Sequence, residues 1–440
     1  MKVKGTQIEA RSWLSAASVL TLIGLLWLMA GPRVDVVAFA GSSVRVEDAL
    51  LAAALVVVIA RWRVVRPLIT GRGGIGVVTC VSLVAAGVGV ASGTVRLAPS
   101  ILYAIRPFEY WAVFPLVLLL LARGGRAAET ALLRVLAVAT VAHTLVAMAQ
   151  FLFGFNIGFS AFSLERGAGL TNGPYELGAI MAMLVCFWLS ERRLVLTMFA
   201  GAGLLMSLSR VSIIGVIVGL AVMGLAYALR RGSSPVVRRP SPRPESVVAL
   251  TVAAVAVVLA LPMIASQLIV PAVDRTQSTS ISDSWSAGRQ LAAITPRSDN
   301  SDQYAATAYD AIGDTVLDNV TSGDASNEVR FYRWNLLLNE LTRSPERLAL
   351  GLGPSFAGPS VDGAYLRIAV ESGLVGIGVW LFMFRGWVRR SPPWFVGAAA
   401  SLFVGAVFID LFYAERPMLF LWMLLALAVH RSANRKDPTR

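Results

Sequence analysis

Apolar runs long enough to cross a lipid bilayer recur along most of the 440-residue chain. A spanning helix needs about 20 largely apolar residues. Hydrophobic residues make up 56% of the sequence and charged residues 15%, whereas roughly a quarter of the residues of a soluble domain are charged. So few charges cannot cover a soluble surface. The sequence therefore predicts an all-α polytopic membrane protein.

Twelve apolar segments are predicted to span the membrane. The stretch 194–230 is too long for one crossing and is interrupted by Arg210, so a hairpin of two short spans fits it best. The first segment is too long for a cleaved signal peptide, and no small-residue cleavage site follows it. The twelve segments are centred on residues 13–30, 47–62, 75–91, 101–122, 127–150, 174–190, 194–208, 211–229, 247–267, 362–384, 394–412 and 417–430.

Lys and Arg are divided unequally between the two sets of connections. One set, which includes both termini and the Pro/Ser/Arg-rich linker 230–246, holds 23 of them, and the short connections of the other set hold six. The positive-inside rule places the richer set in the cytoplasm. Both termini are then cytoplasmic, as an even number of spans requires. Topology thus accounts for most of the net charge of +13, and we expect the lipid bilayer, and no nucleic acid, as a partner.

The spans define three regions: residues 1–267 with spans one to nine, an extracytoplasmic loop at 268–361, and residues 362–440 with the last three spans and a basic tail. The loop is Ser/Thr/Asp-rich as far as residue 327, which favours irregular structure. Apolar residues then recur at helical spacing and predict an amphipathic helix near 327–344 that ends before Pro345. The loop aromatics either stack on sugars or, as we favour, pack the loop: Trp285, Tyr304, Tyr309, Tyr332 and Trp334.

Charged residues within spans are costly unless paired, so they are functional candidates. Most of them fall in the outer halves of the predicted spans. Two local pairs, Arg106 with Glu109 and Arg367 with Glu371, have the alternative role of neutralising each other on one helix. Asp362 has the alternative role of a helix cap or of a charge that favours the N-terminal end of the helix dipole, and His143 is expected to be a hydrogen-bonded core residue. The remaining outer candidates are Glu176, Asp410 and Arg416.

Arginines on the outer side form the second group of candidates. Arg166, Arg210, Arg330 and Arg333 come from three separate connections. The planar guanidinium fork suits phosphate oxygens, so several of these arginines together would make a pyrophosphate clamp. The alternative is that they bind ordinary lipid headgroups. No histidine lies on the outer side, so no His-based metal site or catalytic base is expected there.

Four segments together resemble the bacterial O-antigen polymerase and O-antigen ligase superfamily of membrane glycosyltransferases. They are RGAGLTNGPYELGAI (166–180), LMSLSRVSIIGVIVGL (205–220), VRFYRWNLLLNELTRSPERLALGLGPS (329–355) and DGAYLRIAVESGLVGIGVWL (362–381). The resemblance implies transfer of a glycan from an undecaprenyl-pyrophosphate carrier at the outer face of the bacterial plasma membrane. It implies no nucleotide sugar, metal or other cofactor. Its partners would be the lipid-linked donor, a glycan acceptor and other polysaccharide assembly proteins.

The ligase branch of this superfamily carries a His-Asn pair where this chain has Asp362 and Gly363. We therefore expect a polymerase, with ligase-type transfer to lipid A core or protein as the first alternative. A lipid-linked glycan transporter or flippase is the alternative from another class. Against it, the two halves show no evident repeat, and the large loop is not central.

The resemblance and the charges together assign roles. Asp362 is the first choice of general base for the acceptor hydroxyl, with Glu176 and Glu109 as the next candidates. Arg210 and Arg330 are expected to stabilise the leaving pyrophosphate. Single displacement and double displacement both remain open. The predicted substrate-binding residues are Arg166, Arg333, Tyr365, Arg106, Asp410 and Arg416.

Overall fold

The computed structural model describes residues 3–31, 35–39, 42–69, 74–154, 166–231, 281–310, 325–358 and 361–434. The predicted ninth span, most of the linker 230–246 and the start of the long loop lie outside the described residues. The chain forms two compact units, each of which is described by itself. Unit 1 comprises Met1–Ala226 and Ser344–Arg440, and unit 2 comprises Tyr227–Arg343.

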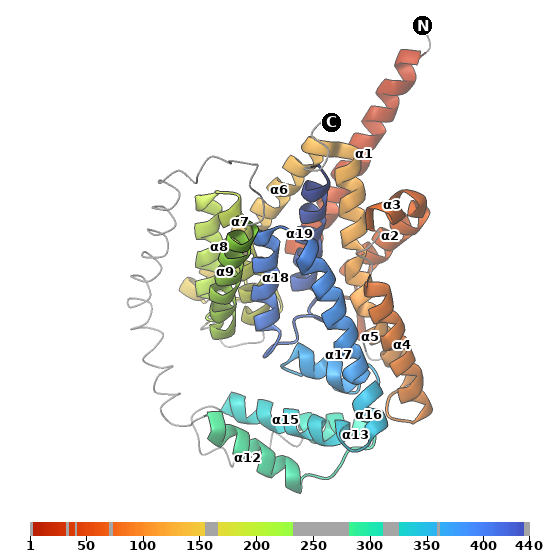
Figure 1. Cartoon of the computed structure of the whole chain (residues 1–440), viewed down its shortest axis with the longest axis vertical. Coiled ribbons are helices and arrows are strands. Elements are labelled where there is room, and N and C mark those ends of the chain that lie inside the picture. The colour runs from red at the N-terminus through yellow and green to blue at the C-terminus, as the bar shows by residue number, and fades with distance from the viewer. Residues whose placement is uncertain are drawn as a thin grey trace. The chain divides into compact units, whose positions relative to one another are not determined.

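Unit 1 is built almost entirely of helices (Figure 1). The prediction of an all-α fold missed a two-stranded antiparallel hairpin, β1 (Asp35–Phe39) with β2 (Ser42–Arg45). Its β-branched valines favour strands, and its segments are too short to span a bilayer. The helices are α1 (Val3–Ala30), α2 (Val46–Ala60), α3 (Trp62–Ile69), α4 (Ile75–Ala91), α5 (Leu97–Trp111), α6 (Val113–Phe153), α7 (Pro174–Ser190), α8 (Leu194–Met206), α9 (Arg210–Arg231), α16 (Pro345–Leu350), α17 (Ala364–Arg390), α18 (Pro393–Gly405) and α19 (Glu415–Asn434).

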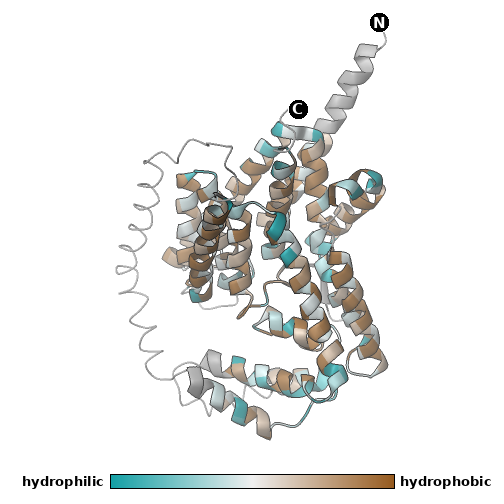
Figure 2. Cartoon of the chain, viewed as in Figure 1, coloured by the Kyte–Doolittle hydropathy of each residue, from teal (hydrophilic) through white to brown (hydrophobic). Residues whose placement is uncertain are grey.

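Apolar residues dominate these helices (Figure 2), as a helical membrane protein requires. Among the described residues, three helical stretches are long and apolar enough to cross a membrane: Leu97–Phe153, Arg210–Arg230 and Ala364–Arg390. The helices α8 and α18 have 13 residues each, which corresponds to about 20 Å and is less than a bilayer core. Every predicted span within the described residues overlaps a helix, but the span 394–412 is helical only to Gly405, and the number of twelve crossings remains a prediction.

The helix α6 changes direction at Gly125, so its two parts run differently (Figure 1). Gly125 has φ 53° and ψ −134°, a conformation that costs little only for glycine. The bend lies between the predicted spans 101–122 and 127–150. A 57-residue apolar stretch is far longer than one crossing needs, and the bend divides it.

Glycines bring α9 and α18 into close contact and fix their direction. A Cβ added at Gly215 would lie 2.7 Å from the Ser401 carbonyl oxygen, and one at Gly219 would lie 2.6 Å from that of Gly397. The numbers rise along α9 as they fall along α18, so the two helices are antiparallel. Small residues allow such close packing of membrane helices.

The same contacts show which helix ends meet. A Cβ at Gly178 would lie 2.6 Å from Ser212 Oγ, so α7 and α9 begin at the same end of unit 1. The Ala364 amide donates to the Ala406 carbonyl at 2.9 Å, so α17 begins where α18 finishes. After a short loop, α19 begins there too. We call this end, where α7, α9, α17 and α19 begin, the site end.

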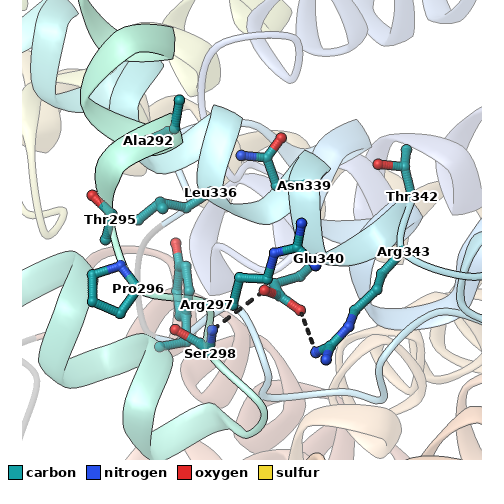
Figure 3. Close-up of a pocket in the computed structure, with 12 residues that line it drawn as sticks. Ala292, Thr295, Pro296, Arg297, Ser298, Leu336, Asn339, Glu340, Thr342 and Arg343 are labelled. Atoms are coloured by element: carbon teal, nitrogen blue, oxygen red, sulfur yellow. Dashed lines mark hydrogen bonds and ion pairs between the residues drawn. The ribbon is translucent and has the colours of Figure 1, made fainter.

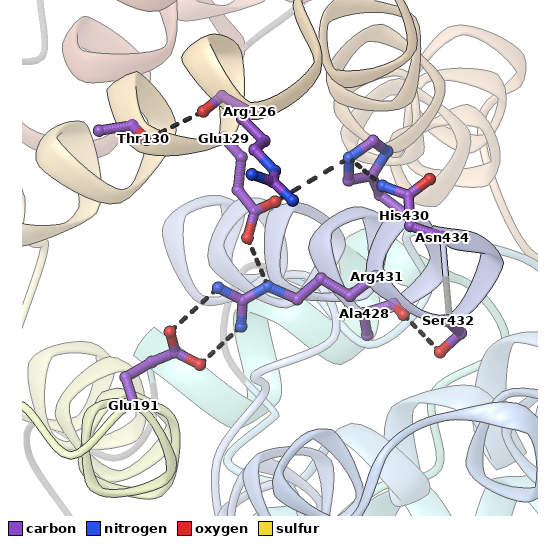
Figure 4. Close-up of polar contacts among 9 residues, drawn as sticks. All are labelled: Arg126, Glu129, Thr130, Glu191, Ala428, His430, Arg431, Ser432 and Asn434. Carbon is purple, nitrogen blue, oxygen red and sulfur yellow. Dashed lines mark hydrogen bonds and ion pairs between the residues drawn. The ribbon is translucent and has the colours of Figure 1, made fainter. Parts of the chain in front are cut away.

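The opposite end of unit 1 is held by ion pairs (Figure 4). Arg431 near the end of α19 donates to both Glu191 carboxylate oxygens at 2.6 and 3.0 Å and to Glu129 Oε1 at 2.7 Å. His430 lies 4.0 Å from Glu129 and pairs with Asn434 at 3.0 Å. These contacts join α6, the turn after α7, and α19, on the side that the basic residues predict to be cytoplasmic.

Unit 2 contains α12 (Ile281–Ile294), α13 (Ser301–Ala305), the π-helical turn η1 (Ala306–Asp310) and α15 (Ala325–Leu341). The prediction of irregular structure up to residue 327 is therefore wrong for 281–294 and for 301–310. Trp285, Gly288 and Ala292 share one helical face, and Trp285 packs edge-on against Phe331 of α15 with ring centroids 5.4 Å apart. Gly288 lets the helices touch, since a Cβ there would lie 2.7 Å from the Tyr332 nitrogen.

Two further details differ from the sequence-based picture. Residues from Ser344 onward belong to unit 1, so the predicted loop 268–361 is divided between the two units. The helix α18 ends at Gly405, before the predicted end of the eleventh span at residue 412. Asp410 therefore lies in the loop before α19 and not on a helix. The favoured packing role of the loop aromatics is confirmed for Tyr304 and Tyr332, which are buried.

Candidate functional site

A buried arginine joins three chain segments at the site end. Arg367 of α17 is fully buried. Its Nη1 donates to Glu371 Oε1 at 2.9 Å, its Nη2 donates to the Gly358 carbonyl at 2.8 Å, and its Nε lies 2.5 Å from Asp410 Oδ2. Arg367 and Glu371 therefore form more than the local helix pair that their spacing suggested. The third member, Asp410, comes from the loop between α18 and α19.

Aromatic rings and a second arginine surround this charge cluster. The Arg367 guanidinium lies 5.1 Å from the Tyr413 ring centre and 5.6 Å from that of Tyr103. The Arg106 guanidinium lies 4.8 Å from the centre of the same Tyr103 ring, and its charge interacts with that of Asp410. Rings next to buried guanidinium groups add cation–π stabilisation. The structure thus brings Arg106 and Asp410, both predicted site residues, to one place.

Asp362 belongs to the same neighbourhood and has an uncommon backbone. Its charge interacts with that of Asp410, and it has φ 53°. Left-handed backbone in a non-glycine residue is uncommon and recurs at functional sites. The residue that caps α17 is Gly363, without a side-chain hydrogen bond. Asp362 directly precedes this cap, a position where a carboxylate is favoured by the positive end of the helix dipole.

Two glycines let a chain segment enter the break in α17. Gly373 has φ 65° and ψ −168° within α17, and a Cβ there would collide with the Ala349 carbonyl. A Cβ on Gly351 would lie 2.6 Å from the Ser372 nitrogen. The Leu352 amide donates to the Val370 carbonyl at 2.7 Å, which satisfies a group that the broken helix leaves free. Close packing at these positions therefore explains why glycines occur in the segments GLG (351–353) and ESG (371–373).

We expect Gly373→Ala to destabilise the protein by about 2 to 4 kcal/mol, because it combines an unfavourable positive φ with overpacking. Gly378→Ala is the matched control, since it lies on the same helix and a Cβ there meets nothing within 4 Å. Thermal unfolding in detergent measures both variants. Equal midpoints for the two would contradict the inserted segment.

A second part of the site end is the turn at 166–173. His143 Nδ1 accepts from the Leu170 amide at 3.2 Å, and its Nε2 pairs with the Met29 carbonyl at 2.9 Å. His143 is thus the hydrogen-bonded core histidine that the sequence predicts. Gln150 Oε1 accepts from the Ala168 and Gly169 amides at 2.8 Å each. These bonds give the turn one fixed conformation.

This turn lies against the tip of the α8–α9 hairpin, since the Gly167 amide donates to the Met206 carbonyl at 2.9 Å. Arg166 donates to the Tyr175 hydroxyl at 3.1 Å. Arg210 is the first residue of α9 and is exposed, and within the described part of the chain it makes no ion pair. Glu176 accepts from the Asn172 amide at 3.4 Å. Two predicted arginines and one predicted carboxylate therefore come from neighbouring turns.

The hairpin tip is stiffened by buried serines. Ser209 Oγ and Ser212 Oγ lie 2.8 Å apart, and Ser207 donates to the Leu204 carbonyl at 2.6 Å. The first turn of α9 presents free backbone amides and the positive end of the helix dipole beside Arg210. An anion near this tip would meet the Arg210 guanidinium and a helix start.

Arg416 lies at the same end of unit 1, and its charge interacts with His143. It is fully buried at the start of α19, donates to the Gly31 carbonyl at 2.5 Å, and lies 3.8 Å from the buried Glu47. Its burial among protein groups indicates a structural role in joining α1, α2 and α19. Its predicted role in substrate binding remains untested.

The remaining predicted residues have more local surroundings. Tyr365 donates its hydroxyl to the Phe403 carbonyl at 3.2 Å, and Glu109 interacts with Asp48 and Arg106. Arg330 and Arg333 belong to unit 2, where Arg333 Nε donates to the Ala308 carbonyl at 3.2 Å. Their predicted place in a clamp stays a prediction.

Sequence reasoning missed the partners of the buried arginines. Glu47, Tyr103 and Tyr413 carried no signal, because their importance depends on neighbours distant in sequence. Within the described residues, no three His, Cys, Asp or Glu side chains are grouped to hold a metal ion. No protein-family model matches the chain, and no curated protein matches it.

Proposed function

We propose that the chain is a polysaccharide polymerase of the O-antigen type. It transfers a glycan from undecaprenyl pyrophosphate to a hydroxyl of an acceptor glycan at the outer face of a bacterial plasma membrane. The observation that carries this proposal is the grouping at the site end: Arg166 and exposed Arg210 on neighbouring turns, with Asp362, Asp410 and Arg106 at the same end of the helices. The four resembling sequence segments support the same function.

The reaction needs a base and a stabilised leaving group. The acceptor hydroxyl oxygen attacks the anomeric carbon, the bond from that carbon to the pyrophosphate oxygen breaks, and the hydroxyl proton passes to Asp362. Arg210, with Arg166 on the neighbouring turn, stabilises the negative charge that develops on the pyrophosphate. The donor, the acceptor and side chains of the protein account for every bond and for the proton in this step.

Polymerase activity is preferred over ligase activity because Asp362 and Gly363 stand where the ligase branch has a His-Asn pair. Purified protein supplied with lipid-linked repeat units alone should build chains of several repeats. Transfer that requires added lipid A core, with no chain growth in its absence, would identify a ligase instead.

One observation favours a second candidate, a lipid-linked glycan flippase. Transporters use helices that are interrupted within the membrane, and α17 is interrupted at Gly373. In the polymerase, the same interruption holds Glu371 next to Ser355, whose amide donates to Glu371 Oε1 at 3.1 Å. Movement of the donor across liposomes without glycan growth would favour the flippase.

A further inference from the structure

A pocket in unit 2 is lined by none of the residues in the proposed chemistry. Its volume is about 490 Å³, within the usual range for ligand pockets of roughly 300 to 1,000 Å³. It lies between the end of α12, the segment that follows it, and α15 (Figure 3). The polar residues that line it include Thr295, Arg297, Ser298, Asn339, Glu340 and Arg343.

Hydrogen bonds hold several of these polar groups in place. Glu340 is buried, and its Oε1 accepts from the Ser298 amide at 3.3 Å. Arg343 donates to Asp299 at 2.8 Å and lies 3.7 Å from Glu340 Oε2. Thr295 Oγ1 lies 3.2 Å from the Tyr332 hydroxyl. A ligand would therefore meet polar groups that are already ordered, which reduces the entropy lost on binding.

The lining combines donors and acceptors at short spacing. Arg297 and Arg343 only donate, Glu340 only accepts, and Asn339 and the hydroxyl groups do both. This combination suits a ligand with many hydroxyl groups, each of which also donates and accepts. An acyl chain or an apolar peptide would leave these groups without partners at a cost.

The charges of the pocket leave one cation available. Asp299 and Glu340 neutralise Arg343. Arg297 is exposed, and within the described part of the chain it makes no ion pair. An anionic group on the ligand, either a carboxylate or a phosphate, would find its partner in Arg297.

We propose that this pocket binds a short stretch of glycan and that Arg297 pairs with an anionic substituent on it. This inference rests on the proposed function, because it gives unit 2 the role of holding the acceptor or the product chain. It also goes beyond that function, since it assigns a saccharide site outside the reacting groups and predicts that the polymer is acidic.

The test is binding of the purified full-length protein in detergent to an array of neutral, uronic-acid-containing and phosphate-containing bacterial oligosaccharides, followed by titration of the best ligand. We expect acidic glycans to be retained. Arg297→Ala should weaken that ligand at least tenfold, and Asn339→Leu should weaken both acidic and neutral analogues. The uronic-acid and phosphate arms identify which anion is recognised.

Arg289→Ala is the matched control, because Arg289 is exposed on α12, carries the same charge and does not line the pocket. It should bind like the unchanged protein. Retention of no glycan, or equal losses for Arg289→Ala and Arg297→Ala, would overturn the pocket. The binding assay contains no lipid-linked donor, so it tests the pocket alone. Glycan binding by a protein that does not polymerise in the separate liposome reconstitution would refute only the proposed function, and polymerisation there by a protein that binds no glycan would refute only the pocket.

Discussion

Arg367→Ala is expected to destabilise unit 1 by about 3 to 5 kcal/mol, because it leaves a buried ion-pair network without its cation. Glu371 is fully buried, and Asp410 is largely so. Both carboxylates depend on the same guanidinium, which also binds the Gly358 carbonyl. The thermal unfolding midpoint in detergent and the fraction of monodisperse protein measure the effect.

Two comparisons make this expectation specific. Arg385→Ala removes an exposed arginine from the same helix and should leave the midpoint unchanged. The triple variant with Arg367→Met, Glu371→Gln and Asp410→Asn removes all three charges and should recover part of the lost stability, since uncharged groups of similar size avoid the unpaired carboxylates. Equal stability of the Arg367→Ala and Arg385→Ala proteins would contradict the network.

Arg210→Ala should lower the rate of glycan transfer by at least about a hundredfold, the usual effect of removing one donor to a developing anion. The fold should survive, because Arg210 is exposed and the buried serines hold the hairpin tip. Arg210→Lys should recover part of the rate, since it keeps the charge but loses the planar fork. Arg389→Ala, an exposed arginine at the opposite end, should transfer normally. A fully active Arg210→Ala protein would remove Arg210 from the clamp.

The proposed base has an independent test. Asp362→Asn preserves shape, and asparagine tolerates the positive φ of this position, so loss of activity would report on the carboxylate. We expect transfer to fall by about a hundredfold or more, with smaller losses for Glu176→Gln and Glu109→Gln. Unimpaired polymerisation by Asp362→Asn would assign the base elsewhere.

Much of the helix pattern could be predicted, because apolar periodicity is local. The α8–α9 hairpin was expected from the interruption at Arg210, and α15 (Ala325–Leu341) overlies the helix predicted near 327–344. The helix α12 was hidden by its polar composition, since only its contacts with Phe331 and Tyr332 show which face is buried. The bend at Gly373 was also unexpected, because its cause is a segment some 20 residues earlier in the chain.

The candidate site was predictable in its residue types but not in its pairings. The cost of buried charge identified Arg367, Glu371 and Asp410 without any structure. That Arg367 joins the other two depends on how α17 meets the loop after α18. The link between Arg416 and Glu47 likewise spans most of the chain. Spacing along one helix could suggest only the local pair, and tertiary contact supplied the third partner.

The most direct test of the central claim is a reconstitution of the purified protein in liposomes with one defined undecaprenyl-pyrophosphate-linked repeat unit. Glycan length and released undecaprenyl pyrophosphate are measured together, without any nucleotide sugar. We predict a ladder of longer glycans and one released carrier for each bond formed, both lost with Arg210→Ala. Unchanged donor, or donor moved across the bilayer without elongation or carrier release, would contradict the proposed glycosyltransferase.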